Sequence, residues 1–309
     1  MGRVGVLWRV KGLSWIGSQH LFYPGARIYL LDSSAKMQLL RDLRKWPVHR
    51  VSAYILTFNE AEKIADAIKS VSWADEVLVV DSNSTDNTVK IAESLGARVV
   101  QIKFEGFGSL RNSAIQACCH PWIFSLDTDE FCSSAVSEEV RQHISNLKHR
   151  AFFVPRRNYF LGSEIKHSGW FPNYRQPQLF HRDAMRYEIS PVHEGFELSK
   201  GETLGYFKNA IWQLPFKDMS ESIAKMNRYS SLGATKRRQA NSSYAKAFGH
   251  AVWAFLRHYI FKRGVLDGWA GFIIAFSYFE VTFYRYVKAV ELDHQVEWHE
   301  QWQKILQGK

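Results

Sequence analysis

The chain has 309 residues, of which 46% are hydrophobic, so it can bury a sizeable core in one large domain with an appendage or in two smaller domains. None of its three cysteines lies in a C-x-x-C pair, which excludes a disulfide framework and a cysteine zinc site and fits a reducing compartment. The net charge of +10 lies on the flanks: nine Lys/Arg against two Asp/Glu in residues 1–50, ten against two in residues 217–263, but 17 against 20 in residues 51–216. Basic flanks suit an anionic membrane, an anionic glycolipid or nucleic acid, although a merely solvated basic surface has the same composition.

Residues 1–50 show no clear hydrophobic period and are predicted to form a basic extension. Met37 offers an alternative start of translation, and the sequence leaves open whether the preceding residues belong to the native protein. The first apolar stretch, Val4–Trp8, is short and is followed by basic residues, so no convincing signal peptide is present.

From Val51 onward, strand-like and helix-like segments alternate. The expected strands are Val51–Thr57, Glu76–Asp81, Ala97–Phe104 and Trp122–Leu126. The expected helices are Glu60–Val71, a helix capped by Ser84 or Thr85 that ends at Leu95, a loop and helix over Gly106–Cys118, and Ala135–Leu147. This order predicts an α/β fold with a mainly parallel sheet and helices on both faces. Ligands on such sheets bind beyond the carboxyl ends of the strands, where the polar residues of this chain cluster.

Three carboxylates follow the fourth strand in Asp127-Thr128-Asp129-Glu130. Carboxylates this close repel one another, and a divalent cation relieves that cost. Mg²⁺ or Mn²⁺ often takes one or two carboxylates together with substrate phosphates, so an aspartate pair at a strand end can hold a metal against a diphosphate. The alternative is a helix N-terminus whose acids favour the helix dipole.

Polar residues also follow the first two strands and lie in the third expected helix segment. Thr57-Phe58-Asn59-Glu60 ends the first strand, and Asp81 ends the second, where it can accept hydrogen bonds from a base or ribose or simply shape a turn before the next helix. Arg111 follows Gly106-Phe107-Gly108 and can pair with phosphate, or it is a solvated helix residue. Neither G-x-G-x-x-G nor G-x-x-x-x-G-K-[ST] is present, which disfavours a dinucleotide site and a P-loop.

The order of these motifs resembles family 2 glycosyltransferases. The resemblance covers residues 51–135 and rests on Tyr54–Glu60, Val79–Ser82, Ser84–Asp86, Gly106–Gly108, Arg111-Asn112 and Asp127–Glu130. It implies the GT-A fold, a nucleotide-sugar donor, a divalent metal (Mg²⁺ or Mn²⁺) and inversion at the anomeric carbon.

The resemblance also implies roles for individual residues. The turn containing Thr57, Asn59 and Glu60 would contact the nucleotide together with Asp81, and Arg111 would lie near the nucleotide or its diphosphate. Asp127 would contact the nucleotide sugar, and Asp129 would be the metal ligand.

The second half of the chain is similar to the lipopolysaccharide-core β-glucosyltransferase (WaaE-like) group. The similar segments are Gly169–Pro172, Gln178–Phe180, Val192–Gly195 and Tyr259–Gly264, with Asp267-Gly268 and Gly271. The chain departs from that group at Gln178, where Arg is expected, and at Asn173, where Asp is expected.

That similarity implies that Trp170 and His193 belong to the acceptor region and that Glu194 is the catalytic general base. Without it, His193-Glu194 would be a surface pair in a polar loop. The Gln-x-x-Arg-Trp motif of processive members is not visible in the sequence, which favours the transfer of a single sugar.

The chain after about Phe216 is predicted to be helical. Apolar residues follow helical spacing at Phe248, Val252, Phe255, Leu256 and Tyr259, with basic residues among them. The apolar run Trp269–Phe279 stops at Glu280, so no uncharged run approaches the roughly 20 residues that span a bilayer. We expect this segment to lie in a membrane interface, the alternative being a helix pair packed on the catalytic domain.

Three parts are therefore expected: a basic extension (1–50), a GT-A catalytic domain (51–216) and a helical, basic and aromatic membrane-associating region (217–309). The leading hypothesis is an inverting, metal-dependent glycosyltransferase that moves one sugar, expected to be glucose, from a UDP-sugar to a lipopolysaccharide-core or other lipid-linked acceptor. It would lie peripherally on the inner face of the cytoplasmic membrane and bind no nucleic acid. A nucleotidyltransferase and a basic nucleic-acid-binding protein without catalysis are the open alternatives.

Overall fold

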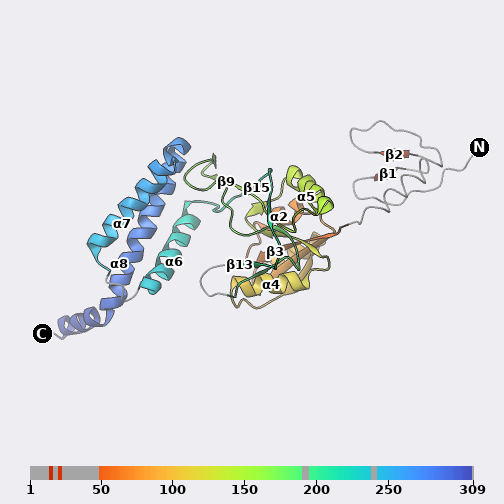
Figure 1. The fold of residues 1–309 in the computed structure, drawn as a ribbon. Coiled ribbons are helices and arrows are strands. Elements are labelled where there is room, and N and C mark those ends of the chain that lie inside the picture. Colours follow the sequence, from red (N-terminus) through yellow and green to blue (C-terminus); the bar gives the residue numbers. More distant parts are fainter. Residues whose placement is uncertain (1–13, 17–19, 23–48, 190–194, 238–241, 308–309) are drawn as a thin grey trace, which may run out of the picture. The chain divides into compact units, whose positions relative to one another are not determined.

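The computed structural model describes residues 14–16, 20–22, 49–189, 195–237 and 242–307 (Figure 1). The chain divides into two compact units, residues 1–48 and residues 49–309. In the first unit, β1 (Ser14–Ile16) pairs antiparallel with β2 (His20–Phe22), where the sequence predicted no strand. The second unit contains the α/β fold.

The main sheet of the second unit has seven strands in the order β14-β8-β11-β6-β3-β4-β5. Their bounds are β3 Val51–Thr57, β4 Glu76–Asp81, β5 Arg98–Gln101, β6 Trp122–Asp127, β8 Ala151–Phe153, β11 Leu179–His181 and β14 Leu204–Tyr206. The four strands β6, β3, β4 and β5 are parallel, as predicted. Strand β11 runs antiparallel to both of its neighbours, so the sheet is mixed rather than wholly parallel.

Helices cover both faces of this sheet, which confirms the predicted α/β layering. On one face, Ala53 and Ile55 of β3 share a core with α2 (Ile64–Ser70), α3 (Thr88–Ser94) and α5 (Ser134–Asn146). On the other face, Tyr54 and Leu56 pack with α4 (Phe107–Ala117). The alternation arises because successive strand residues point to opposite faces, and both faces are buried.

A second sheet follows β6 directly and has the order β10-β9-β15-β7. Its strands are β7 Glu130–Phe131, β9 Arg156–Phe160, β10 Ser163–Ile165 and β15 Ile211–Gln213; a separate pair joins β12 Met185–Tyr187 to β13 Phe196–Leu198. The sequence predicted none of these short strands. Their arrangement places the turn between β6 and β7 at the junction of the two sheets.

Helix α3 begins later than the sequence predicted. Ser84 and Thr85 do not cap it, because the backbone N–H and hydroxyl of Ser84 both donate to Asp81. The backbone N–H of Thr88 donates to Asp86 instead, and the helix starts at Thr88. Helix α2 likewise starts at Ile64 rather than Glu60.

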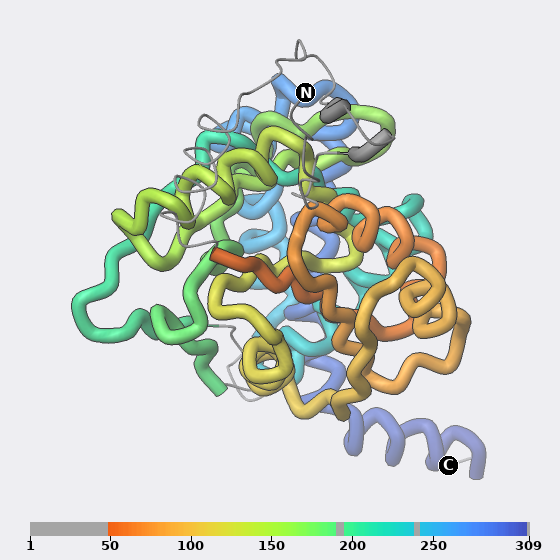
Figure 2. The backbone as a smooth tube through the Cα atoms, turned by 90° about the vertical axis from the view of Figure 1, so that its right-hand side faces the viewer, coloured from red at the N-terminus to blue at the C-terminus, as the bar shows by residue number. Residues whose placement is uncertain are grey.

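The helical region consists of α6 (Met219–Arg237), α7 (Tyr244–Leu256), the π-helical turn η1 (Arg257–Phe261), the 3₁₀ turn η2 (Gly264–Asp267) and α8 (Gly268–Leu306). Helix α8 packs against both α6 and α7 (Figure 1). Its last turns project away from the other helices (Figure 2), and residues 293–306 are exposed.

Within the described residues, one continuous helical stretch, Gly264–Leu306, is long and apolar enough by composition to cross a bilayer. The sequence alone predicted no such span, because Glu280 interrupts the apolar run. Only 28% of its most apolar window is buried inside the protein, so most residues of that window are partly or fully accessible.

Asp267 joins the helical region to the sheet-containing part of the chain. Its carboxylate accepts hydrogen bonds from the backbone N–H groups of Lys166 and His167 and from the hydroxyl of Ser168. A Cβ atom added to Gly271 would lie 1.9 Å from the carbonyl oxygen of Gly264, so only glycine permits this close approach of α8 to η2. Asp267-Gly268 and Gly271, which were noted in the sequence, thus form a structural joint.

We predict that Asp267→Ala lowers the free energy of unfolding by about 1–3 kcal/mol, because it removes a charged acceptor shared by three donors. Chemical denaturation in detergent measures the change. Glu291→Ala removes an exposed carboxylate from the same helix and should change stability by less than about 0.5 kcal/mol. Equal stabilities of the two variants would refute the role of Asp267 as a joint.

Candidate active site

The carboxyl ends of three neighbouring strands bring the predicted site residues together. Thr57 of β3 is the register partner of Asp81 in β4, and Leu56 of β3 is the partner of Asp127 in β6. Parallel pairing therefore gathers at one sheet edge residues that are up to 70 positions apart in the sequence. This is the edge at which open α/β sheets bind ligands.

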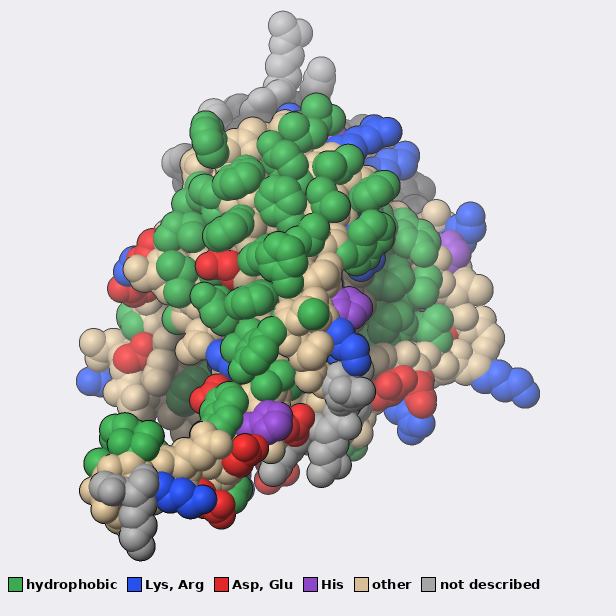
Figure 3. Space-filling model, turned by 90° about the vertical axis from the view of Figure 1, so that its left-hand side faces the viewer, with side chains coloured by type: hydrophobic (Ala, Val, Ile, Leu, Met, Phe, Trp, Pro, Cys, Tyr) green, Lys and Arg blue, Asp and Glu red, His purple; other side chains and the backbone are tan. Residues whose placement is uncertain are grey.

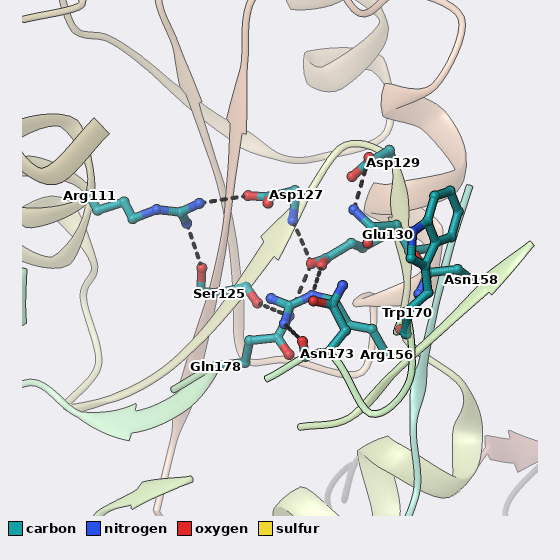
Figure 4. Close-up of polar contacts among 11 residues, drawn as sticks. Arg111, Ser125, Asp127, Asp129, Glu130, Arg156, Asn158, Trp170, Asn173 and Gln178 are labelled. Atoms are coloured by element: carbon teal, nitrogen blue, oxygen red, sulfur yellow. Dashed lines mark hydrogen bonds and ion pairs between the residues drawn. The ribbon is translucent and has the colours of Figure 1, made fainter. Parts of the chain in front are cut away.

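Asp127 is held by Arg111 across this edge (Figure 4). The guanidinium of Arg111 lies 3.1 Å from a carboxylate oxygen of Asp127 and donates a second hydrogen bond to the hydroxyl of Ser125. Burial alone would raise the pKa of Asp127, but the charges of Arg111 and Arg156 outweigh it and hold that pKa below its usual range. Asp127 is therefore ionised at neutral pH.

Glu130, the third carboxylate of the motif, points into the protein rather than toward the ligand edge (Figure 4). One of its oxygens lies 2.5 Å from Nε of Arg156, and both side chains are only 1% exposed. Its other oxygen accepts from the side-chain amide of Gln178 and from the backbone N–H of Asp127. With all these partners, Glu130 anchors the turn and is not free to bind a metal.

Asp129 has a different environment from the other two carboxylates. It accepts a hydrogen bond from the side-chain amide of Gln213, and its carbonyl accepts one from the backbone N–H of Leu214. Burial, and then repulsion from Asp127, raises its pKa. No ion pair joins Asp129 to a basic residue in the part of the chain that the structure describes. The charges of Lys225 and Arg175 lower its pKa, but burial and Asp127 raise it more, so its charge is only partly compensated.

The residues expected around the nucleotide are largely engaged in shaping turns. Both oxygens of Asp81 accept from Ser84, and the side chain of Asn59, at a positive φ of 54°, accepts from the backbone N–H of Thr85. Thr57 carries a buried hydroxyl for which the described residues provide no hydrogen-bond partner. Asn59 and Glu60 line a pocket of about 390 Å³ that also includes Lys217.

Trp170 lies near the second sheet. Its carbonyl accepts from the side chain of Asn158, and its ring packs against Phe160 and Phe216. The predicted acceptor residue His193 and the predicted base Glu194 lie outside the described residues, so their places remain predictions.

Sequence reasoning missed the residues that hold Glu130. Burial alternates along β9, so that Arg156 and Asn158 face inward while Arg157 and Tyr159 face outward. The sequence signal for these residues was the alternation along this strand. It could not identify Arg156 as a site residue, because a buried arginine is explained only by a carboxylate partner, and the sequence did not show which carboxylate that is. Gln178, which stands where Arg was expected, contacts Glu130 directly beside Arg156.

The aspartates of this turn suit a divalent cation such as Mg²⁺ or Mn²⁺ that takes further ligands from elsewhere. Among the described residues, no group of three or more His, Cys, Asp or Glu side chains could hold a metal by itself. Asp127 and Asp129 lie close enough for the charge of one to raise the pKa of the other. Mg²⁺ and Mn²⁺ sites at nucleotides need only one or two carboxylates, with phosphates and water as further ligands. The pair therefore suits a metal shared with a diphosphate.

Comparison with known proteins agrees with this arrangement. Residues 52–200 match the sequence model of glycosyl transferase family 2. An uncharacterized glycosyltransferase of Rickettsia bellii (strain RML369-C) is 28% identical over 80% of this chain and 88% of that protein. The lipopolysaccharide core biosynthesis glycosyltransferase LpsC of Rhizobium meliloti (strain 1021) is 28% identical over 74% of this chain and 87% of that protein.

Among solved structures, this chain is similar to glucosyl-3-phosphoglycerate synthase from Mycobacterium tuberculosis in complex with Mn²⁺, UDP-glucose and phosphoglyceric acid. The TM-score is 0.32 at 22% sequence identity, and the match covers 36% of this chain and 44% of that chain.

The family match begins in β3 and includes every strand end that carries a predicted donor-site residue. Both of the relatives named above are glycosyltransferases that align over most of their length. The chain is thus an enzyme of this class, and neither a nucleotidyltransferase nor a protein without catalysis. The predicted α/β GT-A fold is confirmed, and residues 52–200 form a domain of glycosyl transferase family 2.

Proposed function

We propose that the enzyme transfers a single sugar, glucose, from UDP-glucose to a lipopolysaccharide-core or other lipid-linked glycan, with inversion and with the help of a divalent metal. The observation that carries this proposal is the turn after β6, where Arg111 forms an ion pair with Asp127 while Asp129 forms none with any described residue and is only partly compensated by more distant charges. The similarity to LpsC supports a lipopolysaccharide-core acceptor.

Each residue of the turn has a distinct role in this proposal. Asp129, assisted by Asp127, would hold Mg²⁺ or Mn²⁺, which when bound stabilises the negative charge on the leaving diphosphate. Asp127 would also contact the nucleotide sugar, and Arg111 would lie beside the diphosphate. The buried Glu130 fixes the position of both aspartates.

The nucleotide itself would occupy the edge formed by Thr57, Asn59, Glu60 and Asp81. The unpartnered hydroxyl of Thr57 supports this placement, because a buried polar group without a partner is costly unless a ligand supplies one. The hydrogen bonds of Asp81 and Asn59 to the turn at Ser84 and Thr85 would keep this edge rigid when the donor binds.

We predict that Asp129→Asn lowers kcat by about 10²-fold or more, since a metal supplies several kcal/mol of charge stabilisation in the transition state. Asparagine keeps the size of the side chain and can still accept a hydrogen bond from Gln213. Transfer from radiolabelled UDP-glucose is measured with and without Mn²⁺, together with a melting curve. Asp66→Asn, which changes an 82% exposed carboxylate on α2, is the control. Full wild-type activity in EDTA would refute the metal role.

The acceptor hydroxyl needs a general base, because inversion by one displacement requires it to attack opposite the departing diphosphate. Asp127 and Asp129 would be occupied by donor and metal. Glu130, a rival for this role, is bound by Arg156, Gln178 and the turn itself. We therefore assign the base to Glu194, with His193 as the remaining rival in the acceptor region.

We predict that Glu194→Gln lowers kcat by about 10²–10⁴-fold and leaves the affinity for UDP-glucose nearly unchanged, because glutamine keeps size and polarity but cannot take the proton. Single-turnover kinetics and donor binding by calorimetry separate the two effects. Turnover close to wild type would move the role to His193, which is tested by His193→Gln.

The enzyme would associate with the inner face of the cytoplasmic membrane through its helical region. An aromatic row runs along α8, with successive rings in contact, at Trp269, Phe272, Phe276, Phe279 and Phe283. Apolar side chains cover most of this face (Figure 3), and Trp269 is 80% exposed. An apolar surface of this kind on a basic region supports an interfacial membrane contact rather than packing on the catalytic domain.

We predict that Phe261→Ser with Trp269→Ser reduces binding to anionic vesicles by about tenfold or more, because burial of each large apolar side chain contributes about 1.5–3 kcal/mol. Vesicle flotation at low and high salt measures it, and wild-type binding should weaken with salt. Leu95→Ser, which alters an exposed apolar residue of the catalytic part, is the control. Recovery of the wild type in the soluble fraction whatever the lipid would refute membrane association.

A further inference from the structure

A pocket of about 390 Å³ between α7 and α8 is lined by basic side chains and by no acidic one. Its basic residues are Arg237, Arg257, Arg285, His250 and His258. All its lining residues belong to α6, α7, η1 and α8, so the pocket is separate from the donor edge of the sheet. The function proposed above does not use it.

The arginines of this pocket have no carboxylate partners among the described residues. Several other arginines of the chain are paired: Arg98 with Glu76, Arg150 with Glu202 and Arg186 with Glu197. Like charges gathered in one cavity repel each other, and this cost persists unless an anion neutralises it.

One of the arginines that line the pocket, Arg285, also carries a buried donor without an acceptor. Nε of Arg285 is buried and makes no hydrogen bond to the residues that the structure describes. Its side chain lies against α6 where only glycine leaves space, since a Cβ atom on Gly233 would come within 2.6 Å of Nε. An arginine held in this way is fixed before any ligand binds, which reduces the entropy lost on binding.

Aromatic rings contact three of the other basic groups of the pocket. The guanidinium of Arg237 lies 4.2 Å from the centroid of the Tyr286 ring. His250 stacks on the same tyrosine at 5.0 Å, and His258 stacks on Tyr278 at 3.6 Å. Preorganised donors around one cavity are suited to a compact anion with several acceptor oxygens, such as a phosphate group.

The surroundings of the pocket favour a lipid as the source of that phosphate. Trp253 lines the pocket, is 54% exposed and contacts the ring of Phe261, which is 67% exposed. The aromatic row lies on the same helix as Arg285, and basic and histidine side chains border the apolar face in Figure 3. Exposed aromatic rings of this kind lie at headgroup depth in a membrane, where phosphates are abundant.

We propose that this pocket binds the phosphate of an anionic phospholipid headgroup while the aromatic row lies in the bilayer interface. The proposal rests on the membrane association proposed above and adds a specific lipid site to it. Occupation of the site would fix the orientation of the helical region on the membrane and, through the Asp267 joint, that of the catalytic domain.

The test uses the full-length enzyme and vesicles of phosphatidylcholine with or without phosphatidylglycerol. Arg257→Lys with Arg285→Lys keeps the charge but removes the guanidinium geometry that matches phosphate, so affinity for phosphatidylglycerol vesicles should fall about tenfold. Arg228→Lys, an exposed arginine of α6 outside the pocket, should bind like the wild type. Arg237→Lys, in the last turn of α6, is a second test should the double variant lose its cooperative melting transition.

Two results would overturn the lipid site. If the double variant and Arg237→Lys both bind phosphatidylglycerol vesicles with wild-type affinity, the attraction between enzyme and vesicle is only electrostatic. Calorimetric binding of inorganic phosphate to the detergent-solubilised enzyme as tight as binding to the vesicles would mean a site for a soluble anion. If the wild type binds no vesicles, membrane association itself is refuted. As a control, unchanged transfer to a water-soluble acceptor by the double variant confirms that its catalytic site is intact.

Discussion

The buried ion pair between Glu130 and Arg156 is the constraint on which the site depends. It joins the start of β7 to the start of β9, and both side chains are removed from water. Desolvating two charges is costly, and removal of one partner from such a pair costs about 3–5 kcal/mol, so the pair persists only with nearly ideal partners. Gln178 and the backbone N–H of Asp127 supply the remaining hydrogen bonds. The result is a rigid turn that holds Asp127 and Asp129 at the sheet edge.

A second constraint links the site to the helical region. Asp267 ties η2 to the loop at residues 166–168, and Gly264 and Gly271 allow α8 to approach that joint closely. Trp170 follows the same loop and packs against Phe216, just before α6. In the proposed membrane contact, the helices would therefore set the height of the sheet edge above the bilayer.

The parts of the fold and of the site that could be predicted from the sequence are those that depend on residues close together in the chain. Val51–Thr57 and Glu76–Asp81 were predicted with their observed bounds, because central parallel strands are buried on both faces and form continuous apolar runs. The strands of the second sheet that follow β7 have three to five residues, too few for a recognisable period. The carboxylate motif was visible locally, but the inward turn of Glu130 depends on Arg156, a partner 26 residues away.

The charge balance of the turn distinguishes its three carboxylates. Arg111 forms an ion pair with Asp127 and Arg156 forms one with Glu130, whereas the side chain of Asp129 accepts a hydrogen bond from the neutral amide of Gln213 and feels Lys225 and Arg175 only at a distance. An arginine at position 178 would add a second guanidinium beside Glu130 and make the turn more positive. The neutral Gln178 satisfies Glu130 by hydrogen bonding without that added charge. The turn thus carries three carboxylates against two directly bonded guanidinium groups, a balance that suits a divalent cation shared with an anionic diphosphate.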